Sequence, residues 1–235
     1  MIDLFTGETR QIAVLGAHCD DIALGMGGTL LTLARANPGL SVHALVLTGA
    51  GTEREDEELS ALPAFCPGAS ISVSVLDLPD TRVQAHWDRT KNAVRTFRAG
   101  CEPDIVFAPQ RRDAHPDHRT LAELIPGEFR DHLVLGYEIV KCDVDTPAPT
   151  VFHALDDATV RDKVRLLEKH YPSQAFRDWW DEMAFMSILR LRGVQCRGRY
   201  AEAFVVEKAA IRFGVPKVRR VGCTAPVPAD YRISH

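Results

Sequence analysis

Closely spaced cysteines, long apolar runs and an excess of positive charge are all absent from this sequence of 235 residues. The six cysteines form no CxxC pair and no short-spaced framework of the kind that stabilises small secreted domains, so we interpret them as reduced thiols. No apolar run reaches the roughly 18 residues that a membrane span requires, and the first residues lack the basic and apolar regions of a signal peptide. We therefore expect a cytoplasmic protein without a membrane partner.

The charge balance excludes a further class of partner. The net charge is −4 and the pI is about 6.1, so the chain lacks the strong positive field that holds a phosphate backbone, and we expect no nucleic acid partner. Hydrophobic residues make up 46% of the chain, which is enough for one substantial core. We predict a single domain over residues 1–235, of which about 221–235 form a C-terminal tail.

Short apolar runs alternate with segments of helical length along the first 140 residues. Predicted strands cover residues 11–16, 42–47, 71–78, 104–108 and 133–140. Predicted helices cover residues 22–36, 53–62, 87–99 and 116–124. Further helices are expected at 157–170 and 179–191, and a late strand at 199–207. Strands that alternate with helices predict an α/β fold with a mostly parallel sheet.

Two loops that follow predicted strands carry most of the chemistry. Ala17–Asp21 places an imidazole and two carboxylates directly after the first strand, and His115–His118 follows the strand at 104–108. Either loop alone is also typical of a helix start, where carboxylates cap backbone N–H groups. Ligands of such sheets bind beyond the carboxyl ends of the strands, and a catalytic divalent metal needs three N or O ligands with one open position. Together the loops predict a metal site.

The two loops also resemble the paired motifs of a known family. Ala17–Asp21, then Gly27–Thr29, then His115–His118 are similar in order and spacing to motifs of the zinc-dependent N-acetylglucosaminyl deacetylases. This PIG-L or LmbE-like family includes enzymes of glycolipid-anchor and of mycothiol or bacillithiol biosynthesis. Tyr200–Phe204 adds a further likeness. The resemblance implies a Rossmann-like three-layer sandwich with its active site at the carboxyl ends of the strands.

Carried over by position, the resemblance implies a role for each polar residue of the two loops. The metal ligands fall on His18, Asp21 and His118, which would hold one Zn²⁺ per chain or another divalent metal. The general base falls on Asp20, and the general acid and oxyanion stabiliser on His115. The chemistry needs these types, because amide hydrolysis requires an activated water and a base that takes its proton.

Four other residues are assigned more loosely. Asp117 is placed to orient a catalytic or metal-bound imidazole, although a charge in the first turn of a helix is an equal alternative. Arg54, at a position where the family often has an arginine, and Asp80 and Arg82, which follow a predicted strand, are expected to bind substrate; an exposed helix charge is the alternative for Arg54. Cys19 replaces the family's proline, and its thiol either packs inward or joins the metal.

The resemblance implies a hydrolase that removes the acetyl group from an N-acetylglucosamine-type amino sugar or its conjugate. Two alternatives keep the fold: a metal-dependent hydrolase of another amide or an ester, and an inactive sugar-binding relative. A nucleotide-binding oxidoreductase is disfavoured, because the first loop lacks GxGxxG and carries carboxylates that would repel a pyrophosphate. The sequence leaves open the aglycone, the pathway and the formation of a homo-oligomer.

Overall fold

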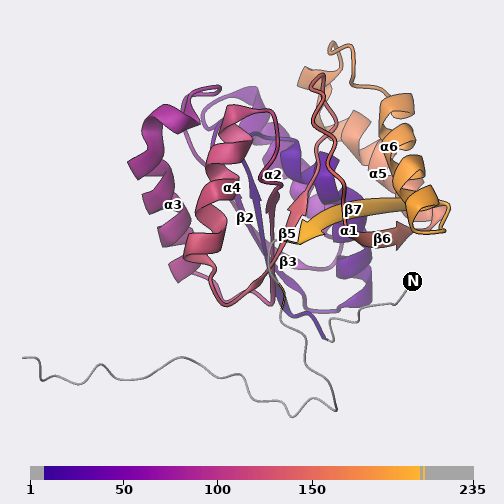
Figure 1. Ribbon diagram of the computed structural model, residues 1–235, viewed down its shortest axis with the longest axis horizontal. Helices are drawn as coiled ribbons and strands as arrows, with labels where there is room; N and C mark the ends of the chain where they lie inside the picture. Colours follow the sequence, from indigo (N-terminus) through magenta and orange to yellow (C-terminus); the bar gives the residue numbers. More distant parts are fainter. Residues whose placement is uncertain (1–7, 207–208, 210–235) are drawn as a thin grey trace, which may run out of the picture.

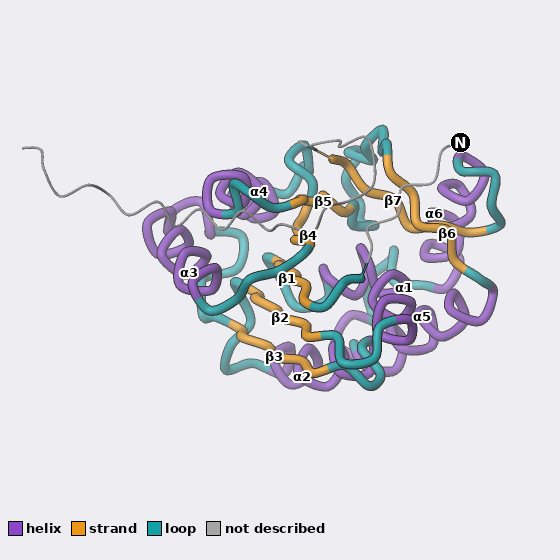
Figure 2. The backbone as a smooth tube through the Cα atoms, turned by 90° about the horizontal axis from the view of Figure 1, so that it is seen from below, coloured by secondary structure: helices purple, strands orange, loops and turns teal. Residues whose placement is uncertain are grey.

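The computed structural model describes residues 8–206 and 209, which form a seven-stranded sheet with helices on both faces (Figures 1 and 2). The strand order is β3-β2-β1-β4-β5-β7-β6. The first five strands are parallel, and β7 runs antiparallel to both β5 and β6. Their bounds are β1 (Gln11–Gly16), β2 (Ser41–Val46), β3 (Ser70–Val75), β4 (Ile105–Pro109), β5 (Leu133–Tyr137), β6 (Val151–Leu155) and β7 (Tyr200–Val206).

The helices divide into two layers. Two of them, α3 (Trp87–Ala99) and α4 (Pro116–Glu128), cover one face of the sheet, and α1 (Asp21–Ala36), α2 (Glu53–Phe65) and α5 (Asp157–His170) cover the other (Figure 2). The remaining elements are α6 (Glu182–Gln195), η1 (Val83–His86) and η2 (Pro172–Gln174). The predicted three-layer α/β sandwich with a mostly parallel sheet is confirmed.

Alternate residues of the central strands enter two separate cores. In β1, Val14 packs with the α1 side, whereas Ala13 and Leu15 pack with the α3 and α4 side. All three side chains have no exposed surface. Burial on both faces is what a covered parallel sheet requires, and it explains why this strand is a continuous apolar run.

Helix α1 is kinked, and side chains from other elements satisfy the backbone groups that the kink frees. Met26 has non-helical angles, φ −146° and ψ 20°. Lys163 Nζ donates to the carbonyl of Leu24 at 2.6 Å, while the Glu202 carboxylate accepts from the backbone N–H groups of Gly28 at 2.8 Å and Thr29 at 2.6 Å. A Cβ at position 28 would lie 2.5 Å from Leu155 Cδ1 and 3.1 Å from Glu202 Oε1, which explains the glycine there.

The observed elements differ from the sequence prediction at several points. Strand β6 was missed, because its residues are mostly half-buried and it pairs only with β7 at the sheet edge. Helices α2 and α4 each continue two residues past an internal proline, Pro63 or Pro126, whereas the predicted helices ended at residue 62 and at about residue 124. Helix α6 begins at Glu182 because Asp181 caps it. The proposed tail at 221–235 lies outside the described residues, and a single domain over the whole chain stays a prediction.

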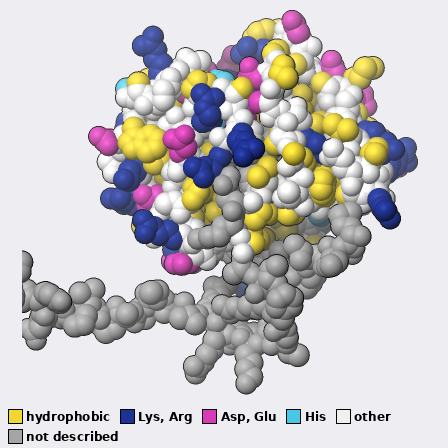
Figure 3. Space-filling view, in the orientation of Figure 1, with side chains coloured by type: hydrophobic (Ala, Val, Ile, Leu, Met, Phe, Trp, Pro, Cys, Tyr) yellow, Lys and Arg dark blue, Asp and Glu magenta, His cyan; other side chains and the backbone are white. Residues whose placement is uncertain are grey.

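Two surface properties follow from the described part of the chain. None of its helices is both long and apolar enough to cross a bilayer. On the face shown in Figure 3, basic and acidic side chains both occur, as the small net charge leads one to expect.

Candidate metal centre

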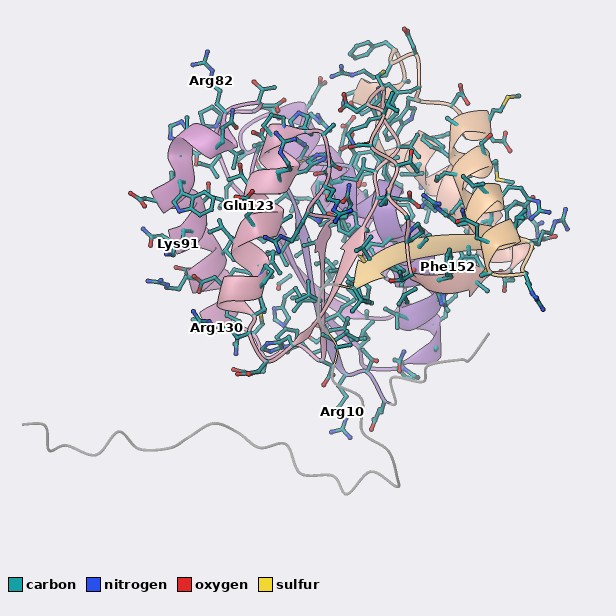
Figure 4. The ribbon with its side chains drawn as sticks, in the orientation of Figure 1. Arg10, Arg82, Lys91, Glu123, Arg130 and Phe152 are labelled. Carbon is teal, nitrogen blue, oxygen red and sulfur yellow. The ribbon has the colours of Figure 1, made fainter. Side chains whose placement is uncertain are left out.

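The two polar loops meet at the carboxyl edge of the sheet. Strand β1 pairs directly with β4, so the loop that leads from β1 into α1 lies beside the loop that leads from β4 into α4. In Figure 4 this edge is at the top, since Arg10 precedes β1 at the bottom and Arg82 follows β3 at the top. As a result, His18 Nδ1 and His118 Nε2 are 3.0 Å apart although 100 residues separate them.

The carboxylate of Asp21 lies close to both of these nitrogens. Its Oδ1 is 3.3 Å from His118 Nε2, and its Oδ2 is 3.6 Å from His18 Nδ1. Ligands placed 2.0–2.1 Å from a tetrahedral zinc ion are about 3.3 Å from one another. The separations of 3.0, 3.3 and 3.6 Å therefore fit one small divalent cation between these three side chains.

The electrostatics of the group also fit a cation. Burial would lower the pKa of both imidazoles, but the Asp21 carboxylate raises that of His118 to about 9 and that of His18 well above its ordinary value. Although burial works against it, the two imidazoles hold the pKa of Asp21 well below its ordinary value. The backbone N–H groups of Ala17 and His18 each donate to Asp21 Oδ2 at 2.9 Å, which fixes the carboxylate. The surroundings of the centre thus stabilise a positive charge placed there.

Asp20 has a different environment from its neighbour Asp21. It is the N-cap of α1, with φ at 105°, in the left-handed region that L-residues rarely adopt. Arg54 lies 2.8 Å from its carboxylate and also donates to the carbonyl of Cys19, while the Asp20 N–H donates to Glu58 Oε2 at 3.0 Å. Burial raises the pKa of Asp20 to about 7 against the opposing charge of Arg54. A carboxylate of this kind is suited to exchanging protons near neutral pH.

His115 stands at the rim of the centre. It caps α4, where its Nδ1 accepts from the N–H of Asp117 at 3.3 Å. Its ring centroid is 4.7 Å from that of His18 and 4.7 Å from that of His118. Burial lowers its pKa, and the two neighbouring imidazoles lower it further. One nitrogen of each of the three rings lies within 4.8 Å of the others, so His115 is close enough to act on a group held at the centre.

The carboxylate of Asp117 contacts His18 and not His115. Its Oδ2 is 3.2 Å from His18 Nε2, and its Oδ1 accepts from the N–H of Val83 at 3.0 Å. This geometry fixes the His18 ring so that Nδ1 faces the centre, as outer carboxylates commonly do for metal-bound histidines.

Two buried carboxyl residues at the site were missed by the sequence prediction. Asp113 Oδ1 is 3.0 Å from His118 Nδ1, and its Oδ2 accepts from Lys141 at 3.1 Å. Glu58 Oε2 accepts from Asp20 N–H and also from the Tyr171 hydroxyl at 2.7 Å. Asp113 follows two arginines in a loop and Glu58 lies in a run of acidic residues, so both look like surface charges in the sequence.

Of the three residues predicted to bind substrate, two lie near the centre and one does not. Arg54 and Asp80 line a cavity of about 230 Å³, and Asp80 Oδ1 is 3.1 Å from His18 Nε2. Arg82 is exposed and extends outward at the edge of the molecule (Figure 4), so the structure does not bring it to the centre. Cys19 also lines this cavity; its buried thiol, whose pKa is raised by burial, donates to the carbonyl of Thr48 at 3.5 Å. It packs inward as a protonated thiol.

Comparison with known proteins finds the family that the sequence motifs resemble. Residues 13–126 match the PIG-L family, described as GlcNAc-PI de-N-acetylase. A diacetylchitobiose deacetylase of Thermococcus kodakarensis is 26% identical over 83% of this chain and 82% of its own length. An uncharacterized deacetylase of Escherichia coli, YaiS, is 28% identical over 69% of this chain and 91% of its own length.

Solved structures support the same fold. The diacetylchitobiose deacetylase of Pyrococcus horikoshii superposes with a TM-score of 0.62 at 20% identity, covering 85% of this chain and 84% of that one. A conserved Thermus thermophilus protein gives a TM-score of 0.66 at 24% identity, over 89% of this chain and 99% of that one. The resemblance found in the sequence is therefore confirmed: residues 13–126 match the PIG-L family model, and the solved structures share the fold.

Proposed function

We propose that this chain is a zinc-dependent N-deacetylase that hydrolyses the acetamide of an N-acetylglucosamine-type amino sugar or its conjugate. One zinc ion per chain would be held by His18, Asp21 and His118. The observation that carries the proposal is the close approach of these three donor sets, 3.0–3.6 Å apart, beside an aspartate that is not one of them. The names of relatives that deacetylate diacetylchitobiose support the substrate class.

Asp20 and Asp21 have separate roles: Asp21 is a metal ligand and Asp20 is the general base. Zinc held here would act as a Lewis acid and would lower the pKa of a bound water from 15.7 to about 7. Asp20, whose pKa is about 7, accepts the proton that the attacking water loses. Arg54, 2.8 Å away, orients the Asp20 carboxylate, and the N–H···Oε2 bond to Glu58 fixes its backbone.

His115 acts on the opposite end of the reacting bond. Its ring centroid is 4.7 Å from those of the two proposed ligand imidazoles, so the carbonyl and the leaving nitrogen of an amide held by the metal would lie within its reach. Its lowered pKa leaves the ring neutral near pH 7, with Nδ1 accepting from the Asp117 N–H, so the N–H at Nε2 is the group that stabilises negative charge on the carbonyl oxygen. As the general acid, the ring would first take up a proton and would then give it to the amine. Removing such a donor typically costs about 100–1000-fold in rate.

Acetate release from a panel of N-acetylglucosaminyl compounds, measured together with the metal content, tests the proposal. The parent protein is expected to contain about one zinc per chain and to release acetate, and the His18→Ala, Asp21→Ala double variant is expected to do neither. Full activity of the double variant would rule the proposal out. Turnover confined to esters or other amides would favour the alternative hydrolase, and metal binding without turnover would favour an inactive sugar-binding protein.

A further inference from the structure

The connection from β5 to β6, residues 138–150, contacts the loop that leads from β4 into α4. It rises above the carboxyl edge of the sheet (Figure 1). Lys141 Nζ donates to Asp113 Oδ2 at 3.1 Å and to Asp145 Oδ2 at 2.6 Å. Asp145 Oδ2 also accepts from the backbone N–H of Ala114 at 2.6 Å. The connection therefore binds two consecutive residues of the loop, through groups that the proposed reaction does not use.

The Asp113 carboxylate is the group through which this contact reaches the metal centre. Its Oδ1 is 3.0 Å from Nδ1 of the proposed ligand His118 and accepts from the backbone N–H of His115 at 2.8 Å. Its Oδ2 faces Lys141. One buried carboxylate thus contacts the outer nitrogen of a ligand imidazole, the backbone of the proposed general acid and the ammonium of the connection.

Lys141 is charged in the folded protein. Its side chain is only 11% exposed, and burial lowers the pKa of its ammonium, but the carboxylates of Asp145 and Asp113 raise that pKa above its ordinary value. Hydrogen bonds between an ammonium and a carboxylate are shorter and roughly twice as strong as those between neutral groups. The two carboxylates and the ammonium therefore form one fixed unit.

Helix α6 anchors the connection on both sides of this unit. The buried Arg192 donates from Nε to Glu138 Oε1 at 2.7 Å and from Nη2 to the carbonyl of Pro147 at 3.2 Å. Glu138 precedes Lys141 and Pro147 follows Asp145, so one guanidinium holds both ends of the stretch that carries the ammonium. A group supported in this way on a helix is held more precisely than one on a free loop.

From these contacts we infer that Lys141 and Asp145 are positioning residues of the proposed deacetylase. They hold the loop through the Asp113 carboxylate and so set the orientation of His115 and His118. The effect on turnover rests on the proposed function. A misplacement of about 1 Å can cost about 100-fold in rate. Because neither positioning residue is a proposed ligand or substrate contact, their loss should lower kcat and leave KM nearly unchanged.

Lys141→Ala, assayed in the zinc-loaded protein with and without n-propylammonium, tests the inference. This cation replaces the atoms that the variant lacks. It can enter because Lys141 and both of its carboxylate partners line a cavity of about 280 Å³. Lys169→Ala, at an exposed position of α5, is the matched control. Acetate release is measured at a temperature at which unfolding curves show every variant to be folded.

Lys141→Ala is expected to lower kcat by about 10–100-fold with little change in KM. The added n-propylammonium should restore much of the lost rate in a saturable manner and should leave the parent unaffected. Lys169→Ala should keep the parental kcat with and without the cation. A parental kcat in Lys141→Ala, a loss confined to KM, or a loss that the cation does not relieve would overturn the inference.

Amide hydrogen exchange in the metal-free protein gives a readout that needs neither zinc nor turnover. The N–H groups of Ala114 and His115 donate to Asp145 and Asp113. In Asp145→Ala, both should exchange about tenfold faster than in the parent, whereas Lys169→Ala should leave them unchanged. Unchanged exchange in Asp145→Ala would show that the connection does not hold the loop. If exchange responds but the parent releases no acetate, the deacetylase proposal fails and the hold on the loop stands.

Discussion

Two consecutive aspartates at the start of α1 are held in opposite states by their surroundings. Two imidazoles and two backbone N–H groups stabilise the charged form of Asp21, whereas burial raises the pKa of Asp20 to about 7. Carboxylates whose pKa values are driven apart are typical of sites where one group binds and the other moves a proton. The left-handed backbone of Asp20 turns the two side chains to different partners.

Replacing Asp20 by asparagine tests this division. Asp20→Asn is expected to retain zinc with nearly unchanged affinity, because its carboxylate is not one of the three proposed ligands. Loss of the base should lower kcat by about 100–10,000-fold. Zinc affinity from competition with a chromogenic chelator and kcat from acetate release check both parts. A large loss of zinc affinity would instead make Asp20 a ligand.

Glu58 gives a prediction for stability against pH. Burial, reinforced by the charges of Asp20 and Asp21, raises the pKa of this fully buried carboxyl to about 8. The folded protein therefore retains a proton that the unfolded chain releases above its ordinary pKa of 4.5. The stabilisation is complete below pH 4.5 and is lost as pH rises through about 8.

Urea unfolding of the metal-free parent and of Glu58→Gln at pH 5 and pH 8 measures this effect. The parent should lose more stability than the variant across this range, by up to about 1.4 kcal/mol per pH unit. Glu123→Gln, at an exposed position of α4, is the control and should follow the parent. A parallel pH dependence in parent and Glu58→Gln would show that Glu58 is ionised in the folded state.

The residues of the site differ in how far the sequence predicted them. The three proposed metal ligands are His18, Asp21 and His118. They lie in two short motifs after neighbouring strands, so residue type and spacing were enough to predict that they lie close together. Asp113 and Glu58 contact the site through bonds that depend on side-chain direction, which no local pattern encodes. Arg82 follows β3 like Asp80, yet its side chain is exposed and points outward.

At the scale of elements, the kink of α1 links the metal loop to the far edge of the sheet. Lys163 on α5 and Glu202 on β7 form an ion pair of 2.6 Å inside the protein, with 2% and 3% of their surfaces exposed. Together they satisfy the carbonyl before the kink and the N–H groups after it. The Gly-Gly-Thr sequence of α1 therefore depends on Glu202, which follows Thr29 by 173 residues, for its backbone hydrogen bonds.

Breaking the Lys163–Glu202 ion pair should lower the free energy of unfolding substantially. Lys163→Met leaves the Glu202 charge buried without its partner, so we expect a loss of about 3–5 kcal/mol in the free energy of unfolding. The control is Arg35→Met, which removes a pair with Asp162 whose side chains are 42% and 31% exposed and should cost at most about 1 kcal/mol. Denaturant unfolding measures both. Similar small losses would show that the kink does not depend on the buried pair.

The regular elements were largely predictable, and their ends were not. Apolar runs predicted β1 to β5, including β3, which lies at an edge of the sheet with alternate residues exposed. β6, at the other edge, has five residues of which most are half-buried, and it was missed. The helix ends were wrong where prolines lie in a last turn, since tertiary packing tolerates a missing N–H donor there.

At the scale of the whole molecule, neighbouring parallel strands bring distant loops to one edge, and the metal would join the halves of the chain that carry them. An ion that binds only the folded protein stabilises it, by about 4.1 kcal/mol when its concentration is 1,000 times Kd. Removing zinc with a chelator should therefore lower Tm by several degrees, and adding zinc should restore it. In the His18→Ala, Asp21→Ala double variant, Tm should not respond to either treatment. An equal response in that variant would place the ion elsewhere.

The most direct measurement of the central claim is an anomalous diffraction map at the zinc absorption edge from crystals of the zinc-loaded protein. We predict one strong peak about 2.0–2.2 Å from His18 Nδ1, His118 Nε2 and an Asp21 carboxylate oxygen. The Cys19 thiol should remain on the carbonyl of Thr48, away from the peak. A peak bonded to Cys19 at about 2.3 Å, or one distant from this triad, would contradict the account.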